Sequence, residues 1–307
     1  MNGQQTLTVR LPFQTPPWQD LEQQGPYEFE LGEYRAALQR TFDQVEVTVV
    51  GLRSEADAER YFERLVCALR WTAVELRYGI LPATELEKVI VLDEPVPEDN
   101  PNRIPVGTEA VANYGACIYP DGLKIVFLRV GDARIGVSVE IERMADLLNE
   151  GMALAICADG AFDDKLRLAF ELYSSLYYER SASARFLAVM MCLEVLKEQR
   201  ERADELIGMI ERWKGEVDEK VRDPREADSL KGGLNRLRRE SIGRSIRKLV
   251  EELLGDRERA REAESLYDLR SRLVHGEDVS DEVRNGAAQA ETLVTDVLKA
   301  ILLRGRP

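Results

Sequence analysis

The stretch LYDLRSRLVHG, at residues 266–276, contains His275, the single histidine among 307 residues. Histidine has an ordinary pKa that lets it both take and give a proton near neutral pH. Five residues earlier lies Arg270, whose guanidinium is always charged and matches the geometry of phosphate. An acid–base group close to a phosphate-binding group is the minimum needed to cleave a phosphodiester without a metal ion.

The same stretch predicts the end of a helix. The residues before His275 have helical spacing, and Gly276 suits the left-handed position that follows a helix. A histidine in that last turn would complement the negative end of the helix dipole and need no catalytic role. Residues five apart lie about 140° apart on a regular helix. Arg270 and His275 therefore reach one phosphate only if the helix bends or ends there, or if a second copy of the chain completes the site.

Helical periodicity extends through the whole C-terminal half of the chain. The predicted helices span about 164–177, 181–196, 229–254, 256–275 and 280–303. In the third of these, Leu230, Leu234 and Leu237 are expected to face inward. Residues 218–228 are charged and contain a proline, so a flexible loop is expected there. Together these patterns predict an all-α helical bundle at residues 162–307.

Residues 1–155 predict a separate α+β domain, although the four prolines before residue 50 would interrupt long elements. The expected elements are a strand at 42–52, a helix at 54–79 with Ser54 as its N-cap, an acidic loop at 93–105, and a hairpin of strands at 123–130 and 133–141 that turns at Gly131-Asp132. Gly151 and Gly160 mark the expected boundary. This half has no phosphate-binding glycine loop and no metal-spaced cluster, so its sequence identifies no ligand.

The composition favours a cytoplasmic protein that neither crosses a membrane nor is secreted. Hydrophobic residues make up 44% of the chain and charged residues 32%, with no run of 18 apolar residues and no signal sequence after Met1. The scattered cysteines are expected to be free, mostly buried thiols; they are Cys67, Cys117, Cys157 and Cys192. Without a second histidine, a zinc or two-metal nuclease is hard to build, so no metal and no cofactor is expected.

The net charge of −14 argues at first against a nucleic-acid partner, but its distribution is uneven. Residues 1–160 carry 14 basic and 26 acidic side chains, whereas residues 161–307 carry 28 basic and 30 acidic ones. Residues 231–248 hold seven basic side chains and one acidic side chain. Such a run is either a solvated helix face or a path for RNA phosphates toward Arg270 and His275.

Several parts of the C-terminal half resemble the HEPN superfamily, in particular its Apea-like branch. The similar segments are LYDLRSRLVHG at 266–276, RFL at 185–187, LEVL at 193–196 and ESI at 240–242. The pair formed by Arg270 and His275 resembles the Arg-x4-6-His motif of that superfamily, and the similarity covers about residues 162–303. The N-terminal domain resembles no family in this way.

The resemblance implies a metal-independent endoribonuclease, as an effector of a bacterial defence or toxin module. In it, His275 would be the acid or base and Arg270 would stabilise charge on the phosphate. The products would carry 2′,3′-cyclic phosphate or 3′-phosphate ends, and single-stranded RNA would be the substrate. HEPN relatives pair two chains so that both motifs line one cleft, which implies a homodimer here. The N-terminal domain would then sense a regulatory protein or ligand.

Supporting roles are expected for three further residues near the motif. Ser271 follows the arginine, where the family often has a polar residue. Glu194 lies on an otherwise apolar helix, so it either points to solvent or pairs with Arg270. Tyr267 is either a core aromatic or a platform for base stacking. The candidate RNA-binding arginines are Arg236, Arg238, Arg239, Arg244, Arg247 and Arg272, although Arg272 also fits a simple surface position.

Two other function classes remain open. One is a non-catalytic HEPN domain that binds RNA or a nucleotide, with Arg270 as the phosphate anchor. The other is a dimerising adaptor, in which the motif only stabilises a helix–helix interface. An intact arginine–histidine pair favours the ribonuclease, whereas the acidic N-terminal half weakens both interpretations that involve RNA.

Overall fold

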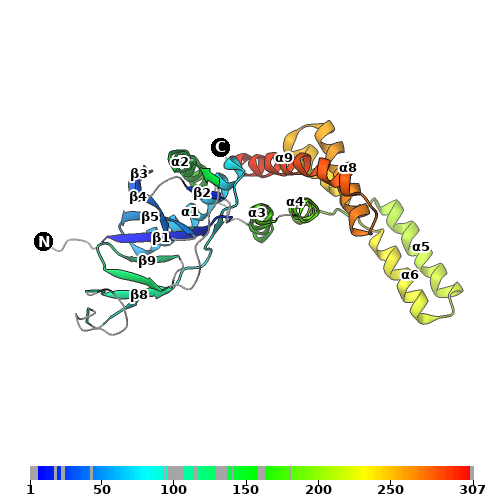
Figure 1. Cartoon of the computed structure of the whole chain (residues 1–307). Helices are drawn as coiled ribbons and strands as arrows, with labels where there is room; N and C mark the ends of the chain where they lie inside the picture. The colour runs from blue at the N-terminus through cyan, green and yellow to red at the C-terminus, as the bar shows by residue number, and fades with distance from the viewer. Residues whose placement is uncertain are drawn as a thin grey trace. The chain divides into compact units, whose positions relative to one another are not determined.

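The computed structural model divides the chain into two compact units (Figure 1). Unit 1 comprises residues 1–162, 173–180 and 301–307, and unit 2 comprises residues 163–172 and 181–300. The structure describes residues 6–304, except for 17–18, 22–24, 42–43, 93, 96–104, 106, 114–115, 129–136, 140, 158–162 and 180. Within these residues no helix is long and apolar enough to cross a membrane.

Unit 1 is built on an antiparallel sheet with the strand order β3-β4-β5-β1-β6, and β9 also pairs with β1. Its strands are β1 (Leu7–Gln14), β3 (Tyr27–Leu31), β4 (Tyr34–Thr41), β5 (Gln44–Leu52), β6 (Leu81–Pro82) and β9 (Cys117–Pro120). The expected strand at 42–52 is therefore present, but the strands before it were missed. The expectation that prolines interrupt long elements was wrong for Pro12, which lies within β1 and whose carbonyl accepts a hydrogen bond from the Ala83 N–H at 3.0 Å.

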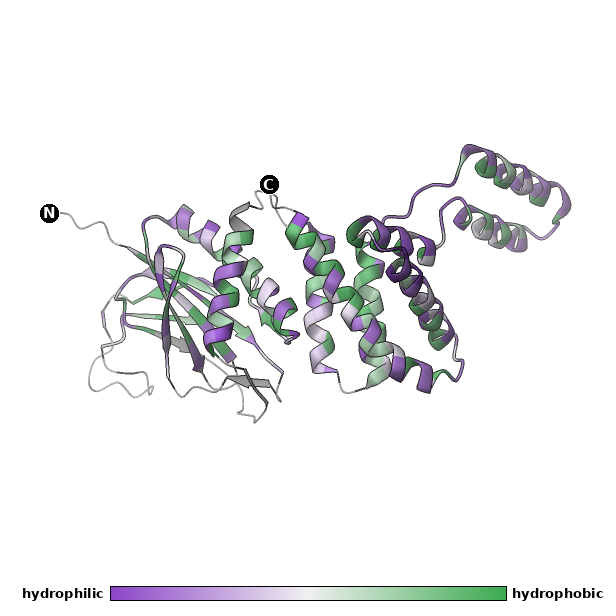
Figure 2. Ribbon diagram, turned by 90° about the horizontal axis from the view of Figure 1, so that it is seen from above, coloured by the Kyte–Doolittle hydropathy of each residue, from purple (hydrophilic) through white to green (hydrophobic). Residues whose placement is uncertain are grey.

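Two helices cover one face of this sheet and form the core of unit 1. They are α1 (Glu55–Leu76), capped by Ser54 as predicted, and α2 (Ile141–Cys157). Alternate residues of β1 and β5, such as Leu11 and Val47, are buried in one core with residues of these helices. Figure 2 shows hydrophobic residues recurring along the strands and the helices of this unit. Gly151 lies inside α2, where an added Cβ would be 2.7 Å from the Ala68 Cα. Gly151 thus allows two helices to pack closely and is not itself the boundary, which lies at 162/163, the far end of the expected range of 150–162.

The remaining strands form two small sheets. In one, β8 (Ala110–Asn113) lies between β7 (Ile90–Val91) and β10 (Ile125–Leu128). In the other, β11 (Val137–Val139) pairs in parallel with β2 (Gln19–Leu21). The predicted hairpin was wrong: β10 and β11 exist but pair with distant strands, and the expected turn at Gly131-Asp132 lies outside the described residues. Most of the expected 93–105 loop also lies outside them.

The bundle of unit 2 is formed by α4 (Ala182–Leu196), α7 (Ile242–Leu254), α8 (Arg257–Val274) and α9 (Ser280–Arg304), with part of α3 (Asp164–Ser175). Ser181 and Asp256 cap α4 and α8 through hydrogen bonds from backbone N–H groups, as serine and aspartate commonly do. Phe186, Leu193 and Val294 are among its fully buried side chains. An N-terminal sheet region followed by a helical region is therefore confirmed.

Two helices between α4 and α7 form an arm, defined here as residues 204–236. The arm consists of α5 (Asp204–Lys220) and α6 (Pro224–Arg236), which pack against each other. The prediction of one helix at 229–254 was wrong, because the chain leaves helical conformation at 238–241 and Ser241 caps a new helix, α7. The loop expected at 218–228 is likewise mostly helical, because Pro224 begins α6 at the first-turn position that tolerates proline.

Cys67, Cys117 and Cys192 are free thiols, as expected, and the side chain of Cys157 lies outside the described residues. Cys117 and Cys192 are buried, whereas Cys67 is half-buried. Burial raises the pKa of the Cys117 thiol to about 11, although the nearby Arg10 guanidinium opposes that shift. These thiols therefore stay protonated near neutral pH and are poor nucleophiles.

Candidate functional site

The end of α8 positions His275. The N–H of Gly276 bonds to the carbonyl of Leu273 at 3.1 Å, and the N–H of Glu277 bonds to the carbonyl of Arg272 at 3.1 Å. Gly276 has a φ of 83°, in the left-handed region that favours glycine. These two bonds and the left-handed glycine form a Schellman motif, the end predicted from the sequence. His275 itself is the C-cap of the helix, so α8 ends at Val274, between Arg270 and His275.

Arg270 is held from two sides by neighbouring side chains. Its Nε lies 2.8 Å from Oε1 of Glu194 on α4, an ion pair in which the two atoms are not aligned as a hydrogen bond. Its guanidinium carbon lies 5.8 Å from the centre of the Tyr267 ring, within the range of a cation–π contact. The Glu194–Arg270 pair inferred from the sequence is therefore present. Among the described residues no hydrogen bond reaches the terminal nitrogens of Arg270, so they can still donate to another anion.

The ring of Tyr267 lies between Arg270 and α7 and contacts both. A Cβ built on Gly243 would lie 3.1 Å from Cδ1 of Tyr267, so this glycine brings α7 close to the ring. Burial raises the pKa of Tyr267, and the nearby carboxylate of Glu194 adds to that shift. The ring is half-buried, intermediate between the core position and the open stacking platform considered from the sequence.

His275 is exposed, and so is its neighbour Val274, of which 53% is accessible. Within the described part of the chain, no group hydrogen-bonds to the imidazole and no hydrogen bond joins it to Arg270. Ser271 is half-buried, and its carbonyl accepts the N–H of His275 at 3.0 Å. Thus an oriented cation and a free imidazole lie on successive turns of one helix end.

Most of the six predicted RNA-binding arginines have acidic partners. Arg238 pairs with Glu211 at 2.7 Å, Arg247 with Glu264 at 2.9 Å, and Arg244 with Glu240 at 3.7 Å; Arg272 pairs with Glu277 at 2.8 Å and Glu282 at 2.7 Å. Among the described residues, the side chains of Arg236 and Arg239 have no such partner and are exposed. The predicted set is therefore divided among the arm, α7 and α8, and does not form one continuous face.

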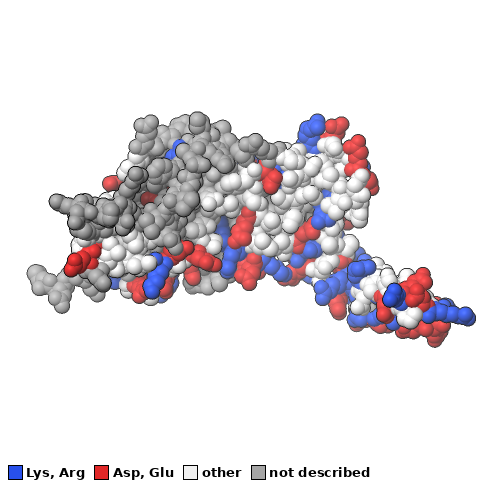
Figure 3. Space-filling view, turned by 60° about the horizontal axis from the view of Figure 1, so that its bottom comes forward, with Lys and Arg blue, Asp and Glu red and all other residues white. Residues whose placement is uncertain are grey.

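The two uncompensated arginines share a cavity at the base of the arm. The cavity has a volume of about 880 Å³ and is also lined by Arg202 and Arg238. Figure 3 shows basic side chains gathered where the arm joins the bundle. The sequence placed Arg236, Arg238 and Arg239 in a basic run, but Arg202 lies outside that run and was not considered. Only the folding of the arm brings Arg202 to the same place.

Unit 1 contains a buried polar cluster that the sequence analysis missed. Arg10 is 1% exposed and donates from Nε to Oε2 of Glu46 at 2.8 Å. Asp121 accepts hydrogen bonds from the hydroxyls of Thr6 and Thr8, each at 2.5 Å. The alternation of Thr8 and Arg10 with Val9 and Leu11 was the available signal. Thr8 and Arg10 are both buried, so this second face of β1 is also covered, and its polar groups satisfy one another.

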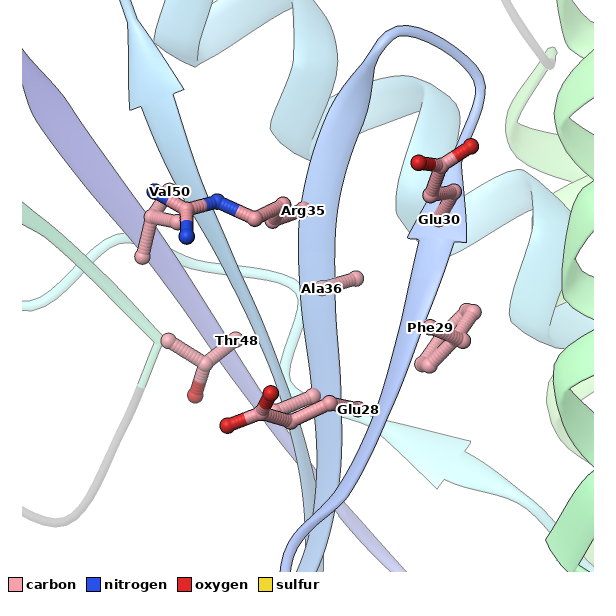
Figure 4. Close-up of a pocket in the computed structure, with 8 residues that line it drawn as sticks. Glu28, Phe29, Glu30, Arg35, Ala36, Thr48 and Val50 are labelled. Carbon is pink, nitrogen blue, oxygen red and sulfur yellow. The ribbon is translucent and has the colours of Figure 1, made fainter.

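A hollow of about 460 Å³ lies over strands β3, β4 and β5. Figure 4 shows Arg35 extending across Val50, with Glu28 reaching toward Thr48. Glu30 lies opposite Arg35 in the strand register. With two carboxylates and one guanidinium on an exposed face, the hollow has no evident preference for an anion or a cation.

The chemistry-bearing residues of the helical unit therefore fall into two groups. In one, Arg270 contacts Glu194 and Tyr267, with His275 about one turn further along at the end of α8; in the other, the arginines of the arm base line a cavity. Comparison of the chain with protein-family models, curated proteins and solved structures finds no match.

Proposed function

We propose that the chain is a metal-independent endoribonuclease of the HEPN type, with His275 as the acid–base group and Arg270 as the phosphate-binding group. The observation that carries this proposal is the arrangement of the α8 end. There, an exposed imidazole follows a guanidinium whose Nε lies beside Glu194 and whose terminal nitrogens have no hydrogen-bond acceptor among the described residues. A carboxylate that fixes one edge of a guanidinium reduces the freedom lost when its other edge binds a phosphate.

In this mechanism the ribose 2′-oxygen attacks the adjacent phosphorus while its proton passes to a base. The bond from phosphorus to the 5′-oxygen then breaks, and that oxygen receives a proton. Neutral His275 suits the first proton transfer and its protonated form suits the second. Arg270 stabilises the negative charge that develops on the other phosphate oxygens. The products are a 2′,3′-cyclic phosphate, which hydrolyses to a 3′-phosphate, and a 5′-hydroxyl.

A homodimer through the helical unit would supply what one chain lacks. Each chain has a single histidine, whereas the two proton transfers are best served by two groups in opposite protonation states. Two chains related by a two-fold axis would present two copies of Arg270 and His275 to one RNA strand. We further propose that such a dimer acts in the cytoplasm as a defence or toxin effector, with the sheet unit binding a regulatory protein or ligand.

The nucleophile provides the test of this function. The purified chain is incubated in EDTA with a single-stranded RNA, and each cleavage position is mapped. The same RNA is then prepared with one 2′-deoxynucleotide on the 5′ side of one cut. We expect that cut alone to disappear and the 5′-fragments to end in cyclic phosphate. Cutting at the deoxy position, or 3′-hydroxyl ends, would contradict the proposal.

The alternative is a non-catalytic module that binds RNA or a nucleotide. It is favoured by the exposure of His275, whose imidazole is oriented by no hydrogen bond among the described residues. In that case RNA binds but is not cut in any condition, and substitution of Arg270 lowers affinity whereas substitution of His275 does not. The adaptor predicts that neither substitution affects RNA binding.

A further inference from the structure

The arm is attached to the bundle through a neck, defined here as residues 199–202 and 237–241. The N–H of Arg202 bonds to the carbonyl of Arg238 at 2.8 Å, and the N–H of Glu240 bonds to the carbonyl of Arg200 at 3.0 Å. The side-chain amide of Gln199 adds a bond to the carbonyl of Glu240 at 3.1 Å. Because both chain segments of the neck are short, these bonds set the direction in which the arm leaves the bundle.

The cavity described above opens at this neck and takes arginines from both of its segments. Arg202 comes from the first segment, Arg238 and Arg239 come from the second, and Arg236 comes from the end of α6. Arg202 is fixed by a bond from its Nε to the carbonyl of Arg239 at 3.2 Å. Arg238 is fixed by Glu211. Two oriented guanidiniums, one of which is already paired with Glu211, therefore lie beside two that have no acidic partner among the described residues. Guanidiniums in one cavity repel each other, and an anion among them relieves that repulsion.

The beginning of α7 adds to the positive potential of the cavity. Ser241, the N-cap, and Ile242, the first helical residue, both line it. The first N–H groups of a helix have no acceptor within the helix, and that end carries a partial positive charge. No acidic residue lies in the first turn of α7 to offset this charge. Helix N-termini of this kind commonly accompany basic side chains in phosphate sites.

Acidic residues around the cavity only partly offset these charges. Glu240 lines it but already binds the Nζ of Lys248 at 2.6 Å, a contact that lowers the pKa of its carboxyl. Glu201 is the other acidic residue in the lining, and it is exposed. The arm itself carries nine acidic and seven basic side chains, so it is not generally basic. The excess of positive charge is local to the neck.

We propose that the neck cavity binds a phosphate-bearing ligand, either the oligophosphate of a nucleotide or the backbone of a nucleic-acid strand. Arginine suits this ligand, because its planar fork donates two parallel hydrogen bonds to phosphate oxygens. The volume of about 880 Å³ exceeds that of a single phosphate and is within the range of nucleotide-sized sites. Since the arginines come from both segments of the neck, a bound phosphate joins them and fixes the arm. The site does not depend on the proposed cleavage at His275.

The test is a calorimetric titration of the full chain with sodium pyrophosphate at low salt. In a second titration, a short oligouridylate is added to the His275→Ala variant, which removes cleavage as a complication. The neck variant combines Arg236→Gln and Arg239→Gln. The matched control combines Arg222→Gln and Arg225→Gln, two exposed arginines at the other end of the arm, with the same change in charge. We expect the neck variant to lose about tenfold or more in affinity, since hydrogen bonds to charged groups are the strong ones.

The two titrations identify the source of the phosphate. Saturable pyrophosphate binding that only the neck variant loses supports a nucleotide ligand. Binding of the oligouridylate alone, again lost only in the neck variant, supports a nucleic-acid backbone. In either case the ligand should slow hydrogen exchange at the N–H groups of Arg202 and Glu240. Absence of binding to both probes, or an equal loss in the control variant, would overturn the proposal.

Discussion

The bundle and the arm of the helical unit are both made of helices with apolar side chains but differ in what covers those side chains. In the bundle, Phe186, Leu193 and Val294 are fully buried. Every residue of the arm is described, and of these only Ile210 and Ala227 are buried. Trp213 and Leu230 remain 44% and 46% exposed. Helical periodicity therefore identifies the apolar face of each helix, but it does not say whether another element covers that face.

This difference predicts unequal costs for the same substitution. Leu193→Ala in the bundle should lower the free energy of unfolding by about 2–5 kcal/mol, because it leaves a cavity in a packed core. Leu230→Ala in the arm should cost about 0.5 kcal/mol, because that side chain already contacts water. Urea denaturation followed by circular dichroism measures both. Equal costs would mean that the arm is covered in solution by a surface absent from the monomer.

A second prediction concerns the ion pair that connects α4 to α8. Glu194→Gln removes the charge that holds Arg270, so RNA cleavage should fall by about tenfold through misplacement of the guanidinium. The stability loss should be about 1 kcal/mol or less, because both side chains are partly exposed. Glu291→Gln is the matched control: it removes the carboxylate that pairs with Arg185 at 3.0 Å elsewhere in the bundle. It should cost similar stability and leave cleavage unchanged. Equal cleavage by both variants would remove Glu194 from the site.

A smaller effect is expected where α7 meets Tyr267. Gly243→Ala places a methyl group 3.1 Å from Cδ1 of the ring, tighter than most such contacts. The ring must shift by a few tenths of an ångström, so we expect the free energy of unfolding to fall by about 1 kcal/mol. Gly233→Ala in the arm, where nothing lies within 4 Å, should be neutral or stabilising. A thermal melt of the two variants compares them directly. A larger loss for Gly233→Ala would contradict the packing described for both positions.

Local signals predicted those parts of the fold that depend on local chemistry. Ser54 and Asp256 begin helices because serine and aspartate cap them, and Gly276 ends α8 because it adopts a positive φ. The pairing of the strands could not be predicted in this way, since β10 and β11 are close in sequence yet pair with β8 and β2. The partners of a strand depend on the whole fold and not on its own residues.

The residues of the candidate sites also divide into those that local sequence could indicate and those that only the fold brings together. For Glu194 the sequence left two positions open, in solvent or paired with Arg270, and the pair is present because a carboxylate on an apolar helix is costly to bury unpaired. By contrast, Arg202 and Arg239 are far apart in sequence, and only the antiparallel neck brings them to one cavity. The inward orientation predicted for Leu230 and Leu237 was wrong, because the apolar face of the arm is left largely exposed. The helix α6 that they belong to or follow is amphipathic, and it packs mainly against α5.

The most direct test of the proposed ribonuclease is the loss of cleavage on removal of His275. Wild type, His275→Ala and the neighbouring control Val274→Ala are compared for RNA cleavage in EDTA, with circular dichroism to verify that each is folded. His275 and Val274 are both exposed near the end of α8, so neither substitution should disturb the core. We predict that Val274→Ala cleaves like wild type and that His275→Ala loses at least about a hundredfold in rate. Cleavage by His275→Ala at the wild-type rate would contradict the proposed function.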